Sequence, residues 1–491
     1  MPEFMAMTCD VLIIGGGPAG AAAARLLASW GHDVMVVNRP SPQAALAESI
    51  PPSTRKLLHR IGIADAVDRA AFIRSTGNTV YWGGERRIAS FADGEYGYQV
   101  ERAGFDALCL RLAEVAGARV LHNATVRSVR TGTAHVVRVS SESSEEEVQA
   151  QWVLDCSGRA GVLARAHRRS QPGRTLALVA TWERSGGWSV PDESHTLVES
   201  YEAGWAWSVP VSETRRCIAF MVDPTLTDVP GRAQLSAQYQ AELNNTMQLS
   251  RLVQDATLVT APWACEASQY DAERASGDGY LLVGDAASFV DPLSSFGVKK
   301  ALASAWLASV VTHTALTQPE LRVHASNLYE ARERSMFAAL QRQSAELARA
   351  ATSTHAHAFW SERSESDSTE SSAEPDLDAL RRDRDLLRAF ERLKQQDSIR
   401  LRPGDAVRRV ELPVVRDNRV ALATHLVSPE YPEGIRYVRA IDLVTLADLA
   451  VEHRQVPDLY DAYQRVAPPA ALPDLLGALS LLIAKGLLQH A

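Results

Sequence analysis

Apolar and polar positions in the first part of the chain alternate in a way that predicts a parallel sheet covered by helices. Residues 9–14 form an apolar run rich in β-branched side chains, and residues 21–30 follow with helical spacing. Further buried strands are predicted at 33–37, 152–155 and 279–283, each ending in a turn or a helix. Strands that alternate with helices are typical of an open α/β sheet.

The pattern changes in the middle of the chain. Residues 175–222 contain short runs of β-forming residues with interleaved aromatic side chains, and residues 79–91 form a predicted hairpin around Gly83 and Gly84. We predict a second, antiparallel sheet that faces the substrate. Long helices are expected at 299–316 and 328–352.

The last part of the chain differs again. Residues 361–375 are rich in Ser, Glu and Asp, which is typical of a flexible linker. Short strands at 410–415 and 419–423 and several helices then predict a small, mostly helical, winged-helix-like module. The predicted domains are the α/β domain at 5–75, 100–165 and 270–352, the substrate sheet at 76–99 and 170–265, the linker at 361–375, and the C-terminal module at 376–491.

Composition narrows the class of protein. The net charge of −8 over 491 residues argues against nucleic-acid binding. The five cysteines are scattered and predict neither a disulfide framework nor a metal site. The sequence shows neither a signal peptide nor an apolar run long enough to span a membrane, so we expect a cytoplasmic protein.

The turn after the first strand carries a G-x-G-x-x-G motif. Gly15 permits a tight turn, Gly17 lets the backbone approach a pyrophosphate, and Gly20 lets the helix pack against the strand. Pro18 and Ala19 lie between Gly17 and Gly20 at the start of the helix, where free N–H groups favour the binding of phosphate. The motif predicts a dinucleotide site.

The second strand ends in Asn38 and Arg39, where dinucleotide-binding domains often carry an acidic residue for the ribose. An asparagine can still form a hydrogen bond with a ribose hydroxyl. The change weakens the prediction of ribose recognition and leaves that of phosphate recognition intact.

Together with the glycine turn, three more segments resemble the FAD signatures of group A flavoprotein monooxygenases. They are Asp155-Cys-Ser-Gly158, Gly284-Asp285-Ala-Ala, and Val-Glu-Arg-x-x-Phe-Asp with Arg102. Flavin-dependent halogenases and geranylgeranyl reductases share that fold. The resemblance implies a Rossmann-type FAD domain in which Asp285 contacts the ribityl chain. The FAD-binding residues that it implies are Gly15, Gly17, Pro18, Ala19, Gly20, Asn38, Arg39, Arg102, Val126, Asp155, Gly158, Gly284, Asp285, Pro292, Gly297 and Val298.

In that family the loop matching residues 291–298 lies beside the reactive face of the isoalloxazine. The candidate catalytic residues are therefore Pro292, Ser294 and Gly297, together with Glu48 from a loop expected above the flavin. The alternative interpretation is an ordinary loop that caps the next helix, with Glu48 as an acidic residue near a helix start.

The segment Trp205-Ala-Trp207-Ser-Val-Pro resembles the W-x-W-x-I-P motif of flavin-dependent halogenases. The alternative interpretation of this segment is an amphipathic strand with both tryptophans on one face. Trp205 and Trp207 are candidate substrate contacts, and Tyr81 and Phe296 complete this set.

Halogenases of this fold use a lysine in the strand matching residues 77–82, and no lysine lies between Lys56 and Lys299. Tryptophan halogenases also carry a glutamate where this chain has Ser294. We therefore predict a monooxygenase in which NADH or NADPH reduces FAD and O2 supplies an oxygen atom to an aromatic ring.

The loop at 291–300 and the added C-terminal module resemble the flavoprotein monooxygenase of quinohemoprotein amine dehydrogenase biogenesis. This implies a tryptophan in a partner polypeptide as a candidate substrate. Three alternatives stay open: a halogenase of an indole, pyrrole or phenol with a relocated lysine, a reductase that needs no oxygen, and a flavin-binding partner protein without turnover.

Overall fold

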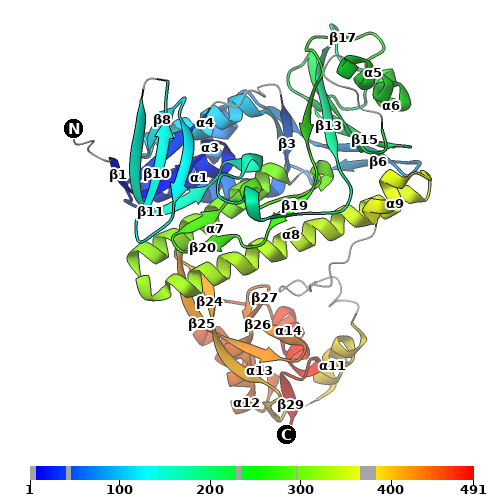
Figure 1. The fold of residues 1–491 in the computed structure, drawn as a ribbon. Coiled ribbons are helices and arrows are strands. Elements are labelled where there is room, and N and C mark those ends of the chain that lie inside the picture. The colour runs from blue at the N-terminus through cyan, green and yellow to red at the C-terminus, as the bar shows by residue number, and fades with distance from the viewer. Residues whose placement is uncertain are drawn as a thin grey trace, which may run out of the picture. The chain divides into compact units, whose positions relative to one another are not determined.

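The computed structural model describes residues 7–39, 46–142, 144–227, 234–294, 296–364, 383–396 and 398–491, except for the side chain of Ser294. These residues form two compact units (Figure 1). The first extends to Arg322 and resumes at Tyr329, and the second contains Val323–Leu328 and residues 383–491. Of the predicted linker, residues 361–364 complete helix α9 (Ala358–Ser364), and 365–375 lie outside the described residues.

A mainly parallel sheet forms the centre of the first unit. Its spatial order is β20-β21-β11-β1-β2-β8, and β9 and β10 extend β11 by antiparallel pairing. The strands are β1 (Met7–Ile14), β2 (Val34–Asn38), β8 (Arg119–His122), β9 (Thr125–Arg130), β10 (His135–Ser140), β11 (Glu145–Asp155), β20 (Ser276–Gly277) and β21 (Tyr280–Leu282).

Helices pack on this sheet and on one another. α1 (Pro18–Ser29) contacts both α4 (Arg102–Val115) and α7 (Gly297–Thr317). Seven of the first nine residues of α1 are glycine, alanine or proline and are buried, so the neighbouring elements approach its backbone closely. The remaining helices of this unit are α2 (Arg55–Ile61), α3 (Ala64–Arg69), α5 (Leu235–Asn245), α6 (Gln248–Leu252) and α8 (Arg322–Thr352).

The strand register brings three predicted turns to one edge of the sheet. Ile14 at the end of β1 pairs with Asp155 at the end of β11, and Asp155 pairs with Leu282 at the end of β21. All three strands run parallel, so the glycine turn and the turns after β11 and β21 leave the sheet side by side. The strand order reverses at β1, and open α/β sheets bind ligands at such a position.

The predicted antiparallel sheet is present, with the order β17-β13-β16-β15-β14-β5-β6 and with β18 paired to β13. The pairing of β14 with β5 is parallel, an exception to the prediction. Its strands are β5 (Gly77–Trp82), β6 (Glu85–Ser90), β13 (Leu176–Glu183), β14 (Thr196–Tyr201), β15 (Gly204–Pro210), β16 (Arg215–Val222), β17 (Thr257–Leu258) and β18 (Trp263–Glu266).

Side chains alternate between the two faces of this sheet. Leu178, Ala206 and Phe220 pack with α5 and α6, whereas Val179 and Trp205 belong to a cluster on the other face. Two small sheets complete the unit. They are β3 (Ala47–Ile50), β7 (Gly97–Glu101) and β4 (Ile73–Ser75), and β12 (Arg168–Ser170), β19 (Tyr270–Ala272) and β22 (Ser288–Phe289).

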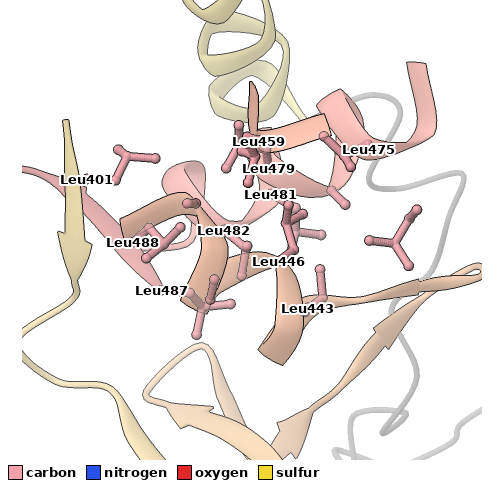
Figure 2. Packing of buried hydrophobic residues seen from close by; sticks show 14 of the residues in the cluster. Leu401, Leu443, Leu446, Leu459, Leu475, Leu479, Leu481, Leu482, Leu487 and Leu488 are labelled. Atoms are coloured by element: carbon pink, nitrogen blue, oxygen red, sulfur yellow. The ribbon is translucent and has the colours of Figure 1, made fainter. Parts of the chain in front are cut away.

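The C-terminal unit has its own leucine-rich core, in which side chains from helices and strands converge (Figure 2). Asp383 and Asp442 each accept two backbone N–H bonds and thereby cap α11 and α12. The elements are α11 (Arg384–Gln395), α12 (Leu443–Glu452), α13 (Val456–Val466), α14 (Leu472–Ala484), β23 (Leu401–Pro403), β24 (Arg408–Arg416), β25 (Arg419–Ser428), β26 (Tyr431–Ile435), β27 (Tyr437–Val438), β28 (Ile441–Asp442) and β29 (Leu488–His490). Within the part of the chain that the structure describes, no helix is long and apolar enough to cross a membrane.

Candidate active site

One cavity of about 1690 Å³ extends from the edge of the parallel sheet to the inner face of the antiparallel sheet. Small-molecule pockets of proteins usually measure roughly 300–1,000 Å³, so this cavity has room for a long cofactor and a second ligand. Gly17, Asp285 and Trp205, which belong to three distant segments, all line it.

The glycine turn is shaped by contacts that exclude side chains. Gly15 has φ +102°, and a Cβ there would lie 2.5 Å from the Cys156 carbonyl oxygen. A Cβ on Gly20 would lie 1.8 Å from the Gly15 oxygen, so α1 packs directly on the turn. Gly20 acts through this packing and does not itself line the cavity.

The N-terminus of α1 opens into the cavity. Gly17 is the N-cap residue, no side chain caps the helix, and Pro18 and Ala19 follow along the cavity wall. A Cβ on Gly17 would meet no protein atom closer than 3.8 Å. The unpaired N–H groups and the helix dipole make this end suitable for phosphate.

Beside this helix start, Asn38, Arg39 and Val126 line the cavity as the sequence predicts. A Cβ on Gly16 would lie 2.7 Å from Asn38 Oδ1, so the glycine makes room for the asparagine amide. Asn38 therefore sits against the turn and offers a hydrogen-bonding group near the phosphate end.

Asp155, another predicted cofactor contact, does not line the cavity, and its role toward the cofactor stays a prediction. Its Oδ1 accepts hydrogen bonds from the Ser157 backbone N–H at 3.0 Å and hydroxyl at 2.5 Å, and its Oδ2 accepts one from Leu163 N–H at 2.7 Å. The buried carboxylate builds the turn after β11. Gly158, with φ +63°, follows it and lines the cavity.

The turn after β21 shows a similar division of roles. Gly284 has φ +64° and does not line the cavity, so its assignment as a direct contact stays a prediction. Asp285 lines the cavity with about a third of its side chain accessible, 32%. Lys300 also lines the cavity, and its Nζ lies 3.7 Å from Asp285 Oδ1.

Arg102 connects two acidic side chains at the cavity wall. It donates a hydrogen bond to Glu48 at 3.3 Å and two to Asp106 at 3.0 and 3.1 Å. Burial raises the pKa of Glu48 above its ordinary value, while the Arg102 charge opposes that rise. Burial raises the pKa of Asp106 in the same way, and Arg102 opposes that rise as well.

The loop before α7 approaches the same place. Pro292, Gly297 and Val298 line the cavity, and a Cβ on Gly297 would lie 3.9 Å from both Glu48 oxygens. The predicted catalytic residues Glu48, Pro292 and Gly297 are thus brought together. The side chain of Ser294 lies outside the described part of the structure.

The far wall of the cavity is aromatic and apolar. Trp205 and Trp207 both line it, from alternate positions of β15. Trp205 is 2% exposed, and its ring lies 6.5 Å from that of Trp82 in an edge contact. Tyr81 and Phe296 do not line the cavity, and their assignment as substrate contacts stays a prediction. Tyr81 lies near Arg86, and Phe296 lies beneath the Lys299 ammonium as the N-cap of α7.

Comparison with protein families identifies the architecture that holds these residues. A model described as an FAD binding domain matches residues 8–316, well over half of the chain. The chain belongs to the FAD-binding domain family. Its FAD-binding assignment agrees with the resemblance found from the glycine and aspartate turns.

Curated relatives that match the chain are described as halogenases. The tryptophan 2-halogenase of Chondromyces crocatus is 30% identical over 315 residues, covering 61% of this chain and 60% of the relative. The flavin-dependent halogenase armH4 of Armillaria mellea is 25% identical and covers 63% and 66%. The chain therefore spans less than two thirds of the length of these curated relatives.

Two solved structures cover nearly the whole chain. The flavin-dependent halogenase CmlS aligns with TM-score 0.79 and 23% identity, covering 99% of this chain and 96% of that one. The peptidyl tryptophan dihydroxylase QhpG, described as essential for tryptophylquinone cofactor biogenesis, aligns with TM-score 0.72 and 22% identity, covering 98% and 100%. Both alignments therefore include residues of the first and of the C-terminal unit of this chain.

The geometry of the cavity fits FAD. The glycine turn leaves α1 uncapped, and Gly17, Gly158 and Gly297 are positions where a Cβ would meet no protein atom closer than 3.8 Å. Asp285 adds a carboxylate to the cavity lining. Sequence reasoning assigned no role to Lys300 or Asp106, although both lie in segments that carry the family resemblance, and both line the cavity.

Proposed function

We propose that this chain is an FAD-dependent monooxygenase that takes electrons from NADH or NADPH and hydroxylates an indole ring. A tryptophan side chain in a partner polypeptide is the proposed substrate. The observation that carries the proposal is the cavity wall formed by Trp205 and Trp207 with Glu48 near them, without a lysine free to act there. Among the described lining residues the one lysine is Lys300, and two backbone carbonyls hold its ammonium group.

The proposed reaction replaces an aromatic C–H bond by C–OH. One atom of O2 enters the product, the other leaves as water, and the nicotinamide gives up a hydride while one proton is taken up from solvent. Bound FAD supplies the chemistry that passes these electrons to oxygen. The chain itself has to bind the ring, orient it and exclude water.

The cavity residues suit those tasks. Trp205 and Trp207 offer flat apolar surfaces on which an indole can stack. Glu48, held by Arg102, can accept a hydrogen bond from an indole N–H and so fix which carbon of the ring faces the cofactor. The N-terminus of α7 lies beside Glu48 and favours negative charge that develops on the ring system in its vicinity.

The polypeptide substrate is supported by the dihydroxylase QhpG, which acts on peptidyl tryptophan by its description and matches all of its length to this chain. A halogenase is the second candidate function. The 30% identity to tryptophan 2-halogenase and the Trp205–Trp207 strand favour it. The position of Lys300 opposes it, because a lysine that carries an oxidised halogen needs an amine directed at the substrate.

The decisive experiment gives the FAD-loaded protein NADH or NADPH, 18O2 and bromide together, with tryptophan, indole and a tryptophan-containing peptide as separate substrates. We expect a product that contains one 18O atom and no bromine. A brominated product would instead establish the halogenase. No product in any arm, with the peptide still bound, would establish a binding protein.

A parallel arm adds a separate flavin reductase. Equal turnover with and without the reductase is expected if this chain accepts electrons from the nicotinamide directly. Turnover that appears only with the reductase would replace the single-component proposal by a two-component one. Turnover without oxygen would support the reductase alternative.

A further inference from the structure

Lys300 occupies the centre of the turn that carries Asp285. It lies on α7, is 2% exposed, and donates hydrogen bonds to the Gly284 carbonyl at 3.0 Å and the Ser288 carbonyl at 2.5 Å. Its third close neighbour is Asp285 Oδ1 at 3.7 Å. One ammonium group therefore joins both ends of the turn between β21 and β22 to the carboxylate that faces the cavity.

The same turn is also held from the adjacent helices. Ser304 Oγ on α7 accepts a hydrogen bond from Gly284 N–H at 2.9 Å. Tyr329 Oη on α8 donates one to the Leu282 carbonyl at 2.7 Å and lies 3.0 Å from Ser304 Oγ. These side chains leave the backbone from Leu282 to Ser288 little freedom to shift.

Behind this network lies a buried carboxyl group that the proposed reaction does not use. Glu333, one turn after Tyr329 on α8, is 4% exposed, and the groups that favour its ionised form are Lys300 and the Ser304 hydroxyl. A buried carboxylate is costly unless a cation or hydrogen-bond donors stabilise it. Lys300 is the cation that acts on it most strongly.

We propose that Lys300 is a positioning residue for the cofactor, which presents the Asp285 carboxylate to the cavity, and that Glu333 behind it sets the net charge of this turn. The proposal rests on FAD binding by this family and is independent of which aromatic substrate is hydroxylated. Lys300 acts through Asp285 and the turn, not by contact with the substrate.

The charges that face Glu333 determine the sign of the effect. Lys300 on α7 attracts its ionised form and Ser304 also favours it, whereas Glu330 on its own helix repels it. Burial is the largest influence and raises the pKa of Glu333 to about 7. Tyr329 stays protonated, since burial holds its pKa well above the ordinary value, and burial does the same for Cys156 at the end of β11.

Two protonation states of the turn follow. Below pH 7 Glu333 is neutral, and the Lys300 charge is balanced by Asp285 alone. Above pH 7 the Glu333 carboxylate balances Lys300 as well, and the turn becomes more negative. A more positive turn favours the electron-rich reduced cofactor, so Glu333 ionisation should lower the reduction potential of bound FAD.

The test measures FAD dissociation constants and midpoint reduction potentials at pH 6 and pH 8 without any aromatic substrate. The variants are Glu333→Gln, Lys300→Met and, as a matched control, Lys299→Met. Lys299 is the neighbouring lysine, and its Nζ donates to Ser53 Oγ away from the turn. Because no substrate is present, failure of the hydroxylation proposal would leave these measurements unaffected.

For Glu333→Gln we expect the wild-type potential at pH 6 and a potential above wild type at pH 8, because the glutamine cannot ionise. For Lys300→Met we expect FAD binding at least about 10-fold weaker, the loss of one charge-assisted interaction, and a lower potential. Lys299→Met should match wild type in both.

A difference between Glu333→Gln and wild type that is the same at both pH values would overturn the role of Glu333. Wild-type affinity and potential in Lys300→Met would overturn that of Lys300. Should Lys300→Met lose the folded circular dichroism signal, Lys300→Arg replaces it. The arginine keeps the charge but changes its position, so wild-type affinity and potential in Lys300→Arg would likewise overturn the positioning role, and weaker FAD binding would support it.

Discussion

The Glu48 carboxylate faces Gly297 across the cavity: a Cβ added to this glycine would lie 3.9 Å from each Glu48 oxygen. Gly297 is the first residue of α7, so the carboxylate lies beside a helix N-terminus as well as beside Arg102. Two positive influences thus act on a group that burial would otherwise keep protonated.

Glu48→Gln should remove a pH-dependent limb of activity. Burial raises the pKa of Glu48, so if the ionised form binds the indole N–H, kcat/KM of the wild type increases with pH through a value above 4.5. The glutamine variant should lose that limb and about 10- to 100-fold of kcat/KM, the usual effect of one strong hydrogen bond. Glu101→Gln, at an exposed position on the neighbouring strand, is the control.

Ionisation of Glu48 should also lower the free energy of unfolding. The pKa of Glu48 is higher in the folded chain than in the unfolded one, so its contribution to the free energy of unfolding is present at low pH and decreases as pH rises through the folded value. Glu48→Gln should gain stability relative to wild type from pH 4 to pH 7 in thermal melts. A constant difference would contradict the raised pKa.

Asp285 and Asp155 should respond differently to removal of their charge. Asp285→Asn should weaken FAD binding by about 10- to 100-fold and leave the melting temperature of the FAD-free protein nearly unchanged, because its carboxylate faces the cavity. Asp155→Asn should lower the free energy of unfolding by about 1–3 kcal/mol, because three buried hydrogen bonds converge on that group. Titration with FAD and denaturant unfolding measure the two effects.

Gly20→Ala should disrupt the cofactor turn. The added Cβ would lie 1.8 Å from the Gly15 oxygen, so α1 must move away from β1, and we expect a loss of several kcal/mol and of FAD binding. Gly104→Ala is the matched control within the same unit. Gly104 lies in helix α4, and a Cβ there would meet only Phe72, at 3.8 Å. The alanine should therefore stabilise the chain by about 0.5–1 kcal/mol. Equal behaviour of the two variants would contradict the close packing.

Trp207→Leu should raise KM for an indole substrate by about 10-fold while FAD binding stays at the wild-type level, since its ring lines the substrate end of the cavity. Tyr81→Leu provides the comparison, because this side chain is half-buried on the same sheet but does not line the cavity. Steady-state kinetics should show wild-type KM for Tyr81→Leu. A larger effect at Tyr81 than at Trp207 would place the substrate elsewhere.

The parallel sheet and the glycine turn could be predicted because their constraints are local. β1 is buried on both faces, and Gly15 needs a positive φ that few other residues adopt. The alternation of Trp205 and Trp207 likewise predicted a shared face, which the cavity lining confirms. Most of the fold could therefore be predicted from the alternation of side chains along the strands and from the residue types in the turns.

The sequence could not separate the residues that face the cavity from the residues that build the turns around it. Asp155 and Gly284 belong to the recognised motifs, yet local hydrogen bonds and packing turn them away from the cavity. Phe296 was placed in the substrate set from its position in a loop, and the structure uses it to cap α7. The approach of Lys300 to Asp285 could not be found from spacing, because tertiary packing produces it. The pair of Arg102 and Asp106, in contrast, has the i,i+4 spacing of one helix and was open to sequence reasoning.

The pairing of Ile14 with Asp155, and of Asp155 with Leu282, has a consequence for biosynthesis. The phosphate-binding turn emerges from the ribosome early, but β11 and β21, whose turns lie beside it, are made only after roughly 140 and 270 further residues. Contacts this distant in sequence form slowly. FAD can thus be captured only after most of the polypeptide has been synthesised. A nascent chain interrupted before β21 should leave the end of β11 with an exposed, aggregation-prone edge.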